Sequence, residues 1–199
     1  YWGAMHHYGH SMRNGAAEIY GQVEDCLKEA ELIVFWASDP EVTNGVYGSF
    51  EGTVRRQWAK ELGIKMIHID PYLNETAAFL GGKWIAPRPS TSPALAQGVT
   101  YVWMTEGLYD KEYVDQRTTG FDKWQTYILG KDEDGIARTP EWAAEETGVP
   151  AREIRALARE WASKKTYLAA GSMGTTLGGA CRSATGAQWA RSMICLMAM

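Results

Sequence analysis

Apolar runs and helical repeats alternate along the middle of the chain, and this alternation is typical of strands connected by helices. The run Leu32–Trp36 is short, β-branched and aromatic, and it ends in the turn-forming cluster at residues 37–40. This run therefore predicts a buried strand. Three further strands are predicted at 64–69, 83–86 and 166–170.

Helices are predicted between and after these strands. Apolar positions within residues 50–62 recur with the period of a helix. Gly63 follows where a glycine is expected after the C-terminus of a helix. The apolar positions of this helix are Val54, Trp58 and Leu62, with Arg55, Arg56 and Lys60 on its other faces. Ser92 as N-cap and Pro93 in the first helical position predict another helix, to about residue 106. The remaining helices are predicted at 22–30, at 139–147, from 150, and from about 182 to the end.

The order of these elements predicts the fold class. Strand–helix–strand spacing of this kind indicates βαβ units and a parallel sheet, so we expect an α/β fold with a Rossmann-like parallel sheet and flanking helices. Ligands of such sheets lie at the carboxyl ends of the strands, which directs attention to the loops at 37–44, 70–74 and 87–92. Because the chain begins without an initiator Met and ends inside an apolar helix, we expect an internal part of a longer protein.

Composition excludes several classes of function. Of the 199 residues, 45% are hydrophobic and 22% are charged, which is ordinary for a soluble globular protein. A net charge of −4 gives no basic surface for nucleic acid, and no apolar run is long enough for a membrane span. The three cysteines are widely separated, which argues against a zinc ribbon or a complete iron–sulfur motif. They suit a reducing compartment, so we expect a cytoplasmic protein.

Polar side chains follow the first two predicted strands. The loop after Trp36 lacks a G-x-G-x-x-G motif, so a standard NAD or FAD site has little support. Its Ser38 and Asp39 offer a hydroxyl and a carboxylate, although a plain turn is the simpler explanation of this loop. Asp70 can accept from ribose hydroxyls or guanine N–H groups, or it can cap the turn before Pro71.

Two later loops could hold an anion. Arg88 lies between two prolines and before a predicted helix N-terminus, an arrangement suited to a diphosphate. A surface arginine in a rigid turn is the alternative. The loop at 171–174, followed by glycines at 178–179, permits close backbone approach to phosphate or pterin, but glycine alone does not identify a ligand.

A histidine cluster lies near the start of the chain. His6, His7 and Tyr8 could be metal ligands, acid–base groups or the wall of a cavity. No neighbouring Asp or Glu completes a metal set, so we predict no metal site from these residues. Structural histidines remain the simplest interpretation.

Taken in order, the segments resemble the DMSO reductase family of molybdenum and tungsten enzymes. Each motif is modestly specific, but their order and spacing are highly so. Residues 1–11 and 54–58 resemble the transhydroxylases of this family, which move hydroxyl groups between polyhydroxybenzenes without net redox change. The matching stretches are Ala30–Glu41, Ile67–Pro71, Trp84–Thr91, Thr139–Pro150 and Arg182–Arg191.

The resemblance implies an enzyme with two molybdopterin guanine dinucleotides around one molybdenum or tungsten atom. Its metal ligand and main catalytic groups would lie outside this chain, so the catalytic residues stay unknown. A phenolic substrate and an iron–sulfur small subunit are the implied partners. Residues 1–20 would end a preceding cofactor-binding domain, 21–165 would form the Rossmann-like domain, and 166–199 would return to the preceding domain.

The resemblance also implies which residues contact the cofactor. On the nucleotide these are Trp36, Ser38, Asp39 and Glu41, with Asp70 on its ribose or guanine and Arg88, Ser90 and Thr91 on its phosphate or base end. On the pterin these are Gly171, Ser172, Met173 and Arg182, while His6, His7 and Tyr8 would line the cavity. One departure is Ser92, where many family members have an aspartate that can pair with guanine.

Two alternatives remain. Another oxidoreductase of the same family, acting by oxygen-atom transfer or on formate, would differ in the metal ligand upstream of this chain. A metal-free nucleotide-binding or scaffolding module would have lost its strand-end polar residues, yet Asp39, Asp70 and Arg88 are present.

Overall fold

A computed structural model describes residues 23–43, 49–170, 180 and 183–199. Within them lies a four-stranded, entirely parallel sheet with the strand order β3-β2-β1-β4. The predicted α/β class and its parallel sheet are confirmed. The strands are β1 (Leu32–Trp36), β2 (Lys65–Ile69), β3 (Lys83–Ile85) and β4 (Thr166–Ala169).

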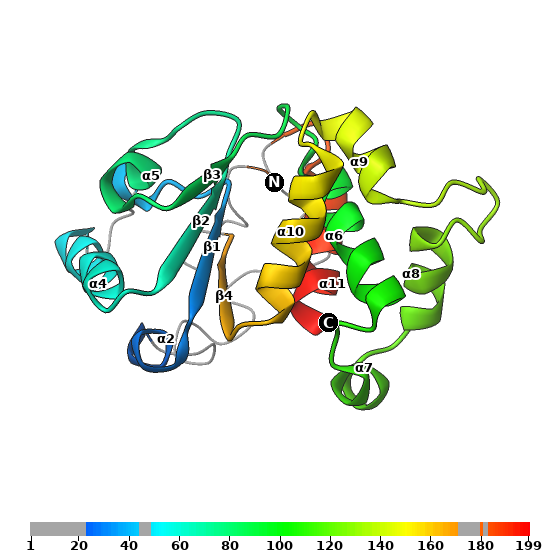
Figure 1. Ribbon diagram of the computed structural model, residues 1–199, viewed down its shortest axis with the longest axis horizontal. Helices are drawn as coiled ribbons and strands as arrows, with labels where there is room; N and C mark the ends of the chain where they lie inside the picture. Colours follow the sequence, from blue (N-terminus) through cyan, green and yellow to red (C-terminus); the bar gives the residue numbers. More distant parts are fainter. Residues whose placement is uncertain (1–22, 44–48, 171–179, 181–182) are drawn as a thin grey trace.

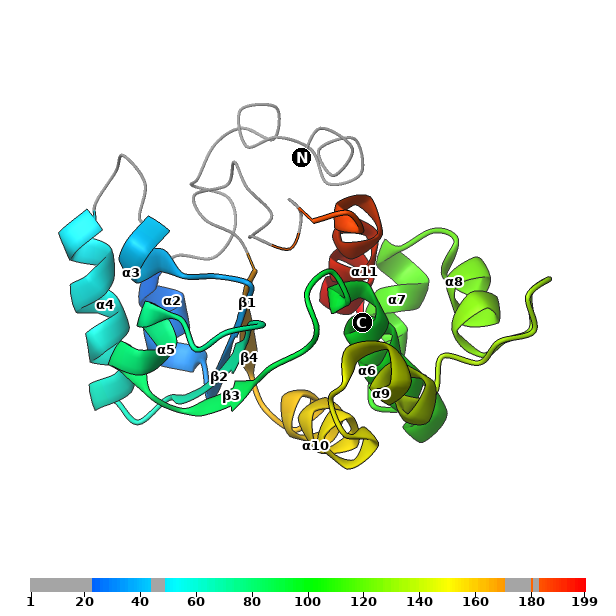
Figure 2. The same ribbon diagram turned by 90° about the horizontal axis from the view of Figure 1, so that it is seen from above.

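Helices cover both faces of the sheet, as Figures 1 and 2 show. One layer contains α2 (Val23–Glu29), α3 (Pro40–Thr43), α4 (Ser49–Glu61) and α5 (Glu75–Leu80). The other contains α6 (Ser92–Glu106), α9 (Pro140–Thr147), α10 (Ala151–Ala162) and α11 (Gly186–Ala198). Beyond α6 lie α7 (Lys111–Arg117) and α8 (Phe121–Ile128). None of the described helices has the length and apolarity needed to cross a membrane.

The central strand β1 is buried along its whole length because both of its faces are covered. Its side chains alternate between two cores, as the period of a strand requires. Leu32, Val34 and Trp36 pack with α6, α10 and α11 in the larger core. Ile33 and Phe35 pack in the smaller core on the side of α2 and α4. The continuous apolar run seen in the sequence is therefore a strand buried on both sides.

The connections reverse direction at β1. From β1 the chain steps outward to β2 and β3 through α3, α4 and α5. It then crosses the other face through α6 to α10 and returns as β4 on the opposite side of β1. In open parallel sheets, ligands bind beyond the carboxyl ends of the strands at such a reversal. The topology therefore directs attention to the carboxyl ends of the strands, the same edge of the sheet that the sequence indicates.

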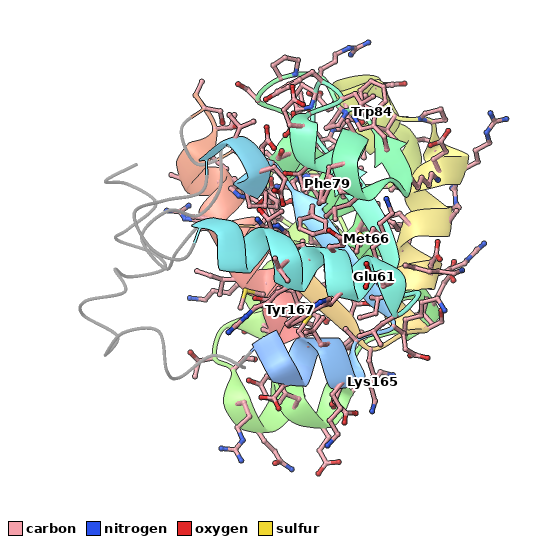
Figure 3. All side chains as sticks on the ribbon, turned by 90° about the vertical axis from the view of Figure 1, so that its left-hand side faces the viewer. Glu61, Met66, Phe79, Trp84, Lys165 and Tyr167 are labelled. Atoms are coloured by element: carbon pink, nitrogen blue, oxygen red, sulfur yellow. The ribbon has the colours of Figure 1, made fainter. Side chains whose placement is uncertain are left out.

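The apolar residues that the sequence predicts for the buried face of α4 are exposed in the structure. On α4, Val54 and Trp58 are 44% and 50% exposed, and Leu62, directly after the helix, is 63% exposed. Ala59 packs instead into the smaller core, and Arg56 turns toward α3 to pair with Glu41. Figure 3 views this layer from outside, with Glu61 of α4 and Phe79 of α5 labelled.

Several predicted boundaries change. The helix expected from about residue 182 begins at Gly186, and α3, α5, α7 and α8 were not located individually from the sequence. Thr91, rather than Ser92, occupies the N-cap position of α6. The division of the chain at residue 165 stays a prediction, although β4 pairs with β1 in the same sheet.

Candidate functional site

The carboxyl ends of β1, β2 and β3 are joined by hydrogen bonds into one edge of the sheet, called the strand-end edge below. Ala37 N donates to Ile69 O at 2.8 Å, which continues the pairing of β1 and β2 into the loop. Asp70 N donates to Ile85 O at 3.1 Å, and Trp84 Nε1 donates to Asp70 O at 2.9 Å. Ala37 has a positive φ of 47°, a conformation that costs free energy for a residue with a side chain. The chain therefore leaves the sheet sharply just before Ser38.

The Asp39 carboxylate is fixed against α5. Its Oδ1 accepts from Thr76 N at 3.0 Å and from Thr76 Oγ1 at 2.7 Å. An acidic side chain at this end of a helix is favoured because the first N–H groups of the helix lack partners within it.

Glu41 is committed to an ion pair. Arg56 Nε donates to Glu41 Oε1 at 2.5 Å, and Thr53 Oγ1 donates to Oε2 at 2.7 Å. The pair is largely buried. In this geometry, Glu41 connects α3 to α4, and both of its carboxylate oxygens are already accepting bonds from the protein.

Asp70 is a carboxylate of which only 8% is exposed. Oδ1 accepts from Tyr72 N at 3.3 Å, the turn-capping role that the sequence left open, and Oδ2 accepts from Asn74 Nδ2 at 3.2 Å. Burial raises the pKa of Asp70; these two hydrogen bonds oppose the rise, and the nearby charge of Asp39 adds to it. Each oxygen keeps a further lone pair, so the group can still accept from another donor.

Arg88 caps the end of a helix. Its Nη1 donates to Glu145 O at 2.7 Å and to Glu146 O at 3.4 Å, in the last turn of α9. A cation is stabilised there by the partial negative charge of the helix C-terminus. The side chain is exposed, and this contact is the surface role weighed as the alternative to anion binding.

The turn after Arg88 is closed by local bonds. Thr91 Oγ1 donates to Arg88 O at 2.7 Å, and Thr185 Oγ1 donates to Ser90 O at 2.7 Å. Ser90 has a positive φ of 65°. The result is a rigid turn that leads into the first residues of α6, where the N-cap side chain makes no capping bond to the helix.

Trp36 lies below the strand-end edge rather than on its surface. The side chain is fully buried, and its ring centroid lies 4.7 Å from that of Trp189. Its Nε1 donates to Ser92 Oγ at 3.1 Å. Trp36 therefore has no exposed surface for a nucleotide in this geometry, and Ser92 is partly occupied by an internal bond.

Sequence reasoning missed two residues of this edge. Asn74 and Thr76 are buried and supply the bonds to Asp70 and Asp39. The available signal was an asparagine four residues after Asp70, since asparagine commonly caps helices. The predicted residues that lie outside the described part of the chain are His6, His7, Tyr8, Gly171, Ser172, Met173 and Arg182.

The described residues of the strand-end edge offer hydrogen-bonding groups. No group of three His, Cys, Asp or Glu side chains that could hold a metal ion occurs among the residues whose positions are given. Asp70 and the Ser38 hydroxyl can hydrogen-bond to ribose or base, as the end of a parallel strand often does. These two side chains therefore have the hydrogen-bonding capacity that a nucleotide would require at this edge.

Comparison with known proteins places this chain in a class of enzymes. The chain belongs to the DMSO reductase family of molybdopterin enzymes. It is 53% identical over all 199 residues to the pyrogallol hydroxytransferase large subunit of Pelobacter acidigallici, of which it covers 22%. It is 39% identical over 166 residues, 79% of the chain, to a dimethyl sulfoxide/trimethylamine N-oxide reductase of Cereibacter sphaeroides, of which it covers 20%.

A solved structure supports the fold. Acetylene hydratase from Pelobacter acetylenicus superposes on 99% of the chain with a TM-score of 0.70, covering 23% of that protein at 20% sequence identity. No family model matches the chain. The chain thus spans about a fifth of the length of the curated relatives it matches.

Proposed function

We propose that this chain is the nucleotide-binding part of a molybdenum or tungsten enzyme that transfers hydroxyl groups between polyhydroxybenzenes. The observation that carries the proposal is the strand-end edge, where Asp70 lies buried with free acceptor capacity beside the sharp turn at Ala37. The 53% identity to a pyrogallol hydroxytransferase subunit supports the transhydroxylase branch of the family.

The proposed cofactor is bis-molybdopterin guanine dinucleotide, which when bound would supply the metal-centred chemistry of the reaction. Toward one of its nucleotides, Ser38 and Asp70 would hydrogen-bond to ribose or guanine. Asp39 would keep the α5 side of the edge in place through Thr76, and the uncapped start of α6 would face the diphosphate. Glu41, Ser90 and Thr91 would shape the surrounding loops through their internal bonds.

The remaining residues complete the proposal. Arg88 would contact the phosphate with guanidinium N–H groups other than those of Nη1, which bond to the end of α9. Ser92 would give guanine a single hydrogen bond, whereas an aspartate would give two. Toward the pterin we propose Gly171, Ser172, Met173 and Arg182, and toward the substrate cavity His6, His7 and Tyr8.

We propose an iron–sulfur small subunit as partner, since the relative from P. acidigallici is named a large subunit. We propose a cytoplasmic location, which the free thiols of the described cysteines Cys26 and Cys195 support. The second candidate function is reduction of an S-oxide or N-oxide, which the 39% identity to a reductase of C. sphaeroides supports.

The first test is elemental analysis of the intact anaerobically purified protein, with release of nucleotides by acid. We expect about one molybdenum or tungsten atom and about two guanine nucleotides per chain. Hydroxyl exchange between trihydroxybenzenes without added reductant would support transhydroxylation, and dye-linked reduction of an S-oxide would favour the second candidate. Folded protein with neither metal nor guanine would contradict both and leave a scaffolding module.

A further inference from the structure

Asn74 connects the strand-end loops of β1 and β2 to the start of α5. Only 2% of its surface is exposed. Its Oδ1 accepts from Ala77 N at 2.9 Å, which caps α5. Its Nδ2 donates to Asp70 Oδ2 at 3.2 Å and to Ser38 O at 3.4 Å.

The orientation of this amide is determined by its partners. Ala77 N can only donate, so the oxygen of the Asn74 amide must face it. Asp70 Oδ2 and Ser38 O can only accept while Asp70 is ionised, so the nitrogen must face them. A flipped amide would oppose like groups at all three contacts.

We propose that Asn74 is a positioning residue for nucleotide binding, holding the Asp70 carboxylate and the Ser38 loop in the arrangement that accepts the nucleotide. This inference rests on the proposed function. Asn74 does not need to touch the nucleotide, because it acts through Asp70. The neighbouring backbone bond from Tyr72 N fixes only Oδ1 of that carboxylate, so Asn74 is what orients Oδ2.

The positioning role of Asn74 can be measured through the pKa of Asp70, which depends on the groups around that carboxylate. Asp39 faces it from the β1 loop, and Tyr72 follows in the same turn. Burial and the charge of Asp39 raise the pKa of Asp70, whereas the bonds from Tyr72 and Asn74 lower it. Loss of the Asn74 amide therefore makes Asp70 take up a proton at a higher pH, and a protonated carboxyl loses acceptor capacity.

The test compares Asn74→Ser with Asn74→Ala in the intact holoenzyme. Serine keeps an acceptor that caps α5 but has no amide to donate to Asp70, whereas alanine loses both functions. We expect both variants to retain the nucleotide of this domain about tenfold less well, since each loses a hydrogen bond to a charged group. Guanine content would fall from about two toward about one per chain.

The pH profile separates positioning from simple folding. Guanine retention, measured after gel filtration from pH 5 to 8, should fail at a higher pH in both variants than in the wild type. The melting temperature should drop further in Asn74→Ala than in Asn74→Ser, because both lose the stabilisation given by bound nucleotide but only Asn74→Ser keeps the cap.

Two results would overturn the inference. One is Asn74→Ser protein whose guanine content and pH midpoint equal those of the wild type. The other is loss of guanine that is independent of pH and parallels the fall in melting temperature in both variants, which would make Asn74 a capping residue only. Wild-type protein that releases no guanine would overturn the proposed function and this inference together.

Discussion

At the scale of single residues, the strand-end edge is held together by donors from the first turn of α5 and from its N-cap residue. Thr76 fixes Asp39, and Asn74 fixes Asp70, so each carboxylate keeps a defined direction before any ligand arrives. Preorganised acceptors of this kind bind better because the ligand does not have to order them.

His68 gives a prediction for the pH dependence of stability. It is buried, stacked on Phe35 at 4.9 Å between ring centroids, and its Nε2 lies 2.9 Å from Gly81 O. Burial lowers the pKa of His68, and the bond to Gly81 opposes this. The folded state thus favours the neutral ring, while the unfolded chain takes up a proton near its ordinary pKa of about 6.5. The stability that this group contributes is therefore present above that pH and is lost as the pH falls.

We expect His68→Phe to remove this component while retaining the stacking on Phe35. Urea unfolding of the wild type and the variant at pH 7.5 and pH 5.5 would measure it. The wild type should lose more free energy of unfolding between the two pH values than the variant. Equal losses would show that His68 does not titrate differently in the folded and unfolded states.

At the scale of elements, α6 and α9 approach closely at a glycine. A Cβ built on Gly98 would lie 2.7 Å from Ala143 Cβ and 3.3 Å from Ile154 Cγ2. Glycine inside a helix normally costs stability relative to alanine, so this position is explained by the packing of α6 against α9.

We expect Gly98→Ala to lower the free energy of unfolding by about 1–3 kcal/mol, because an added methyl overpacks the contact. Adding Ala143→Gly should recover part of the loss, since it removes the atom that Cβ would meet. A double-mutant cycle by denaturant titration measures the coupling, and a coupling energy near zero would show that the helices separate freely.

The elements also show what the sequence can predict. The strand Leu32–Trp36 and the helix end at Glu106 follow from apolar runs and glycine signals that act locally. The short α5 was not located, because the residues that define its start are Asn74 and the distant Asp39. The exposed apolar face of α4 could not be predicted either, since Arg56 turns inward to meet a partner on another helix.

The candidate site shows the same limit. Asp70 and Ser38 are predicted as site residues from their positions at strand ends, which a local pattern reveals. Trp36 sits at such a position as well, yet it is buried by Trp189, a residue 153 positions later on α11. Whether a strand-end side chain points to the ligand or to the core depends on contacts that no local pattern contains.

At the scale of the whole molecule, Trp36 connects the central strand to three helices. It contacts Trp189 of α11 and Trp161 of α10, and it bonds to Ser92 at the start of α6. The larger core therefore ends directly beneath the strand-end edge.

This arrangement predicts that stability and nucleotide binding can be separated. We expect Trp36→Phe and Trp161→Phe each to lower the free energy of unfolding by about 1–3 kcal/mol, because both remove part of a buried indole. Only Trp36→Phe should also lower the guanine content of the intact protein, since only Trp36 bonds to Ser92. Equal guanine content in the two variants would contradict a link between Trp36 and the site.

The reversal of strand order has a consequence for synthesis of the protein. During synthesis, β1 is made long before β4, its neighbour on one side. Glu31 and Lys165, which hydrogen-bond to each other just before these two strands, are 134 residues apart. At ordinary rates of translation this distance takes roughly 7–27 s to make. During that time one edge of a strand with the sequence LIVFW stays open on the ribosome. Such a segment pairs readily with other chains, so we expect the nascent polypeptide to depend on chaperones until β4 emerges.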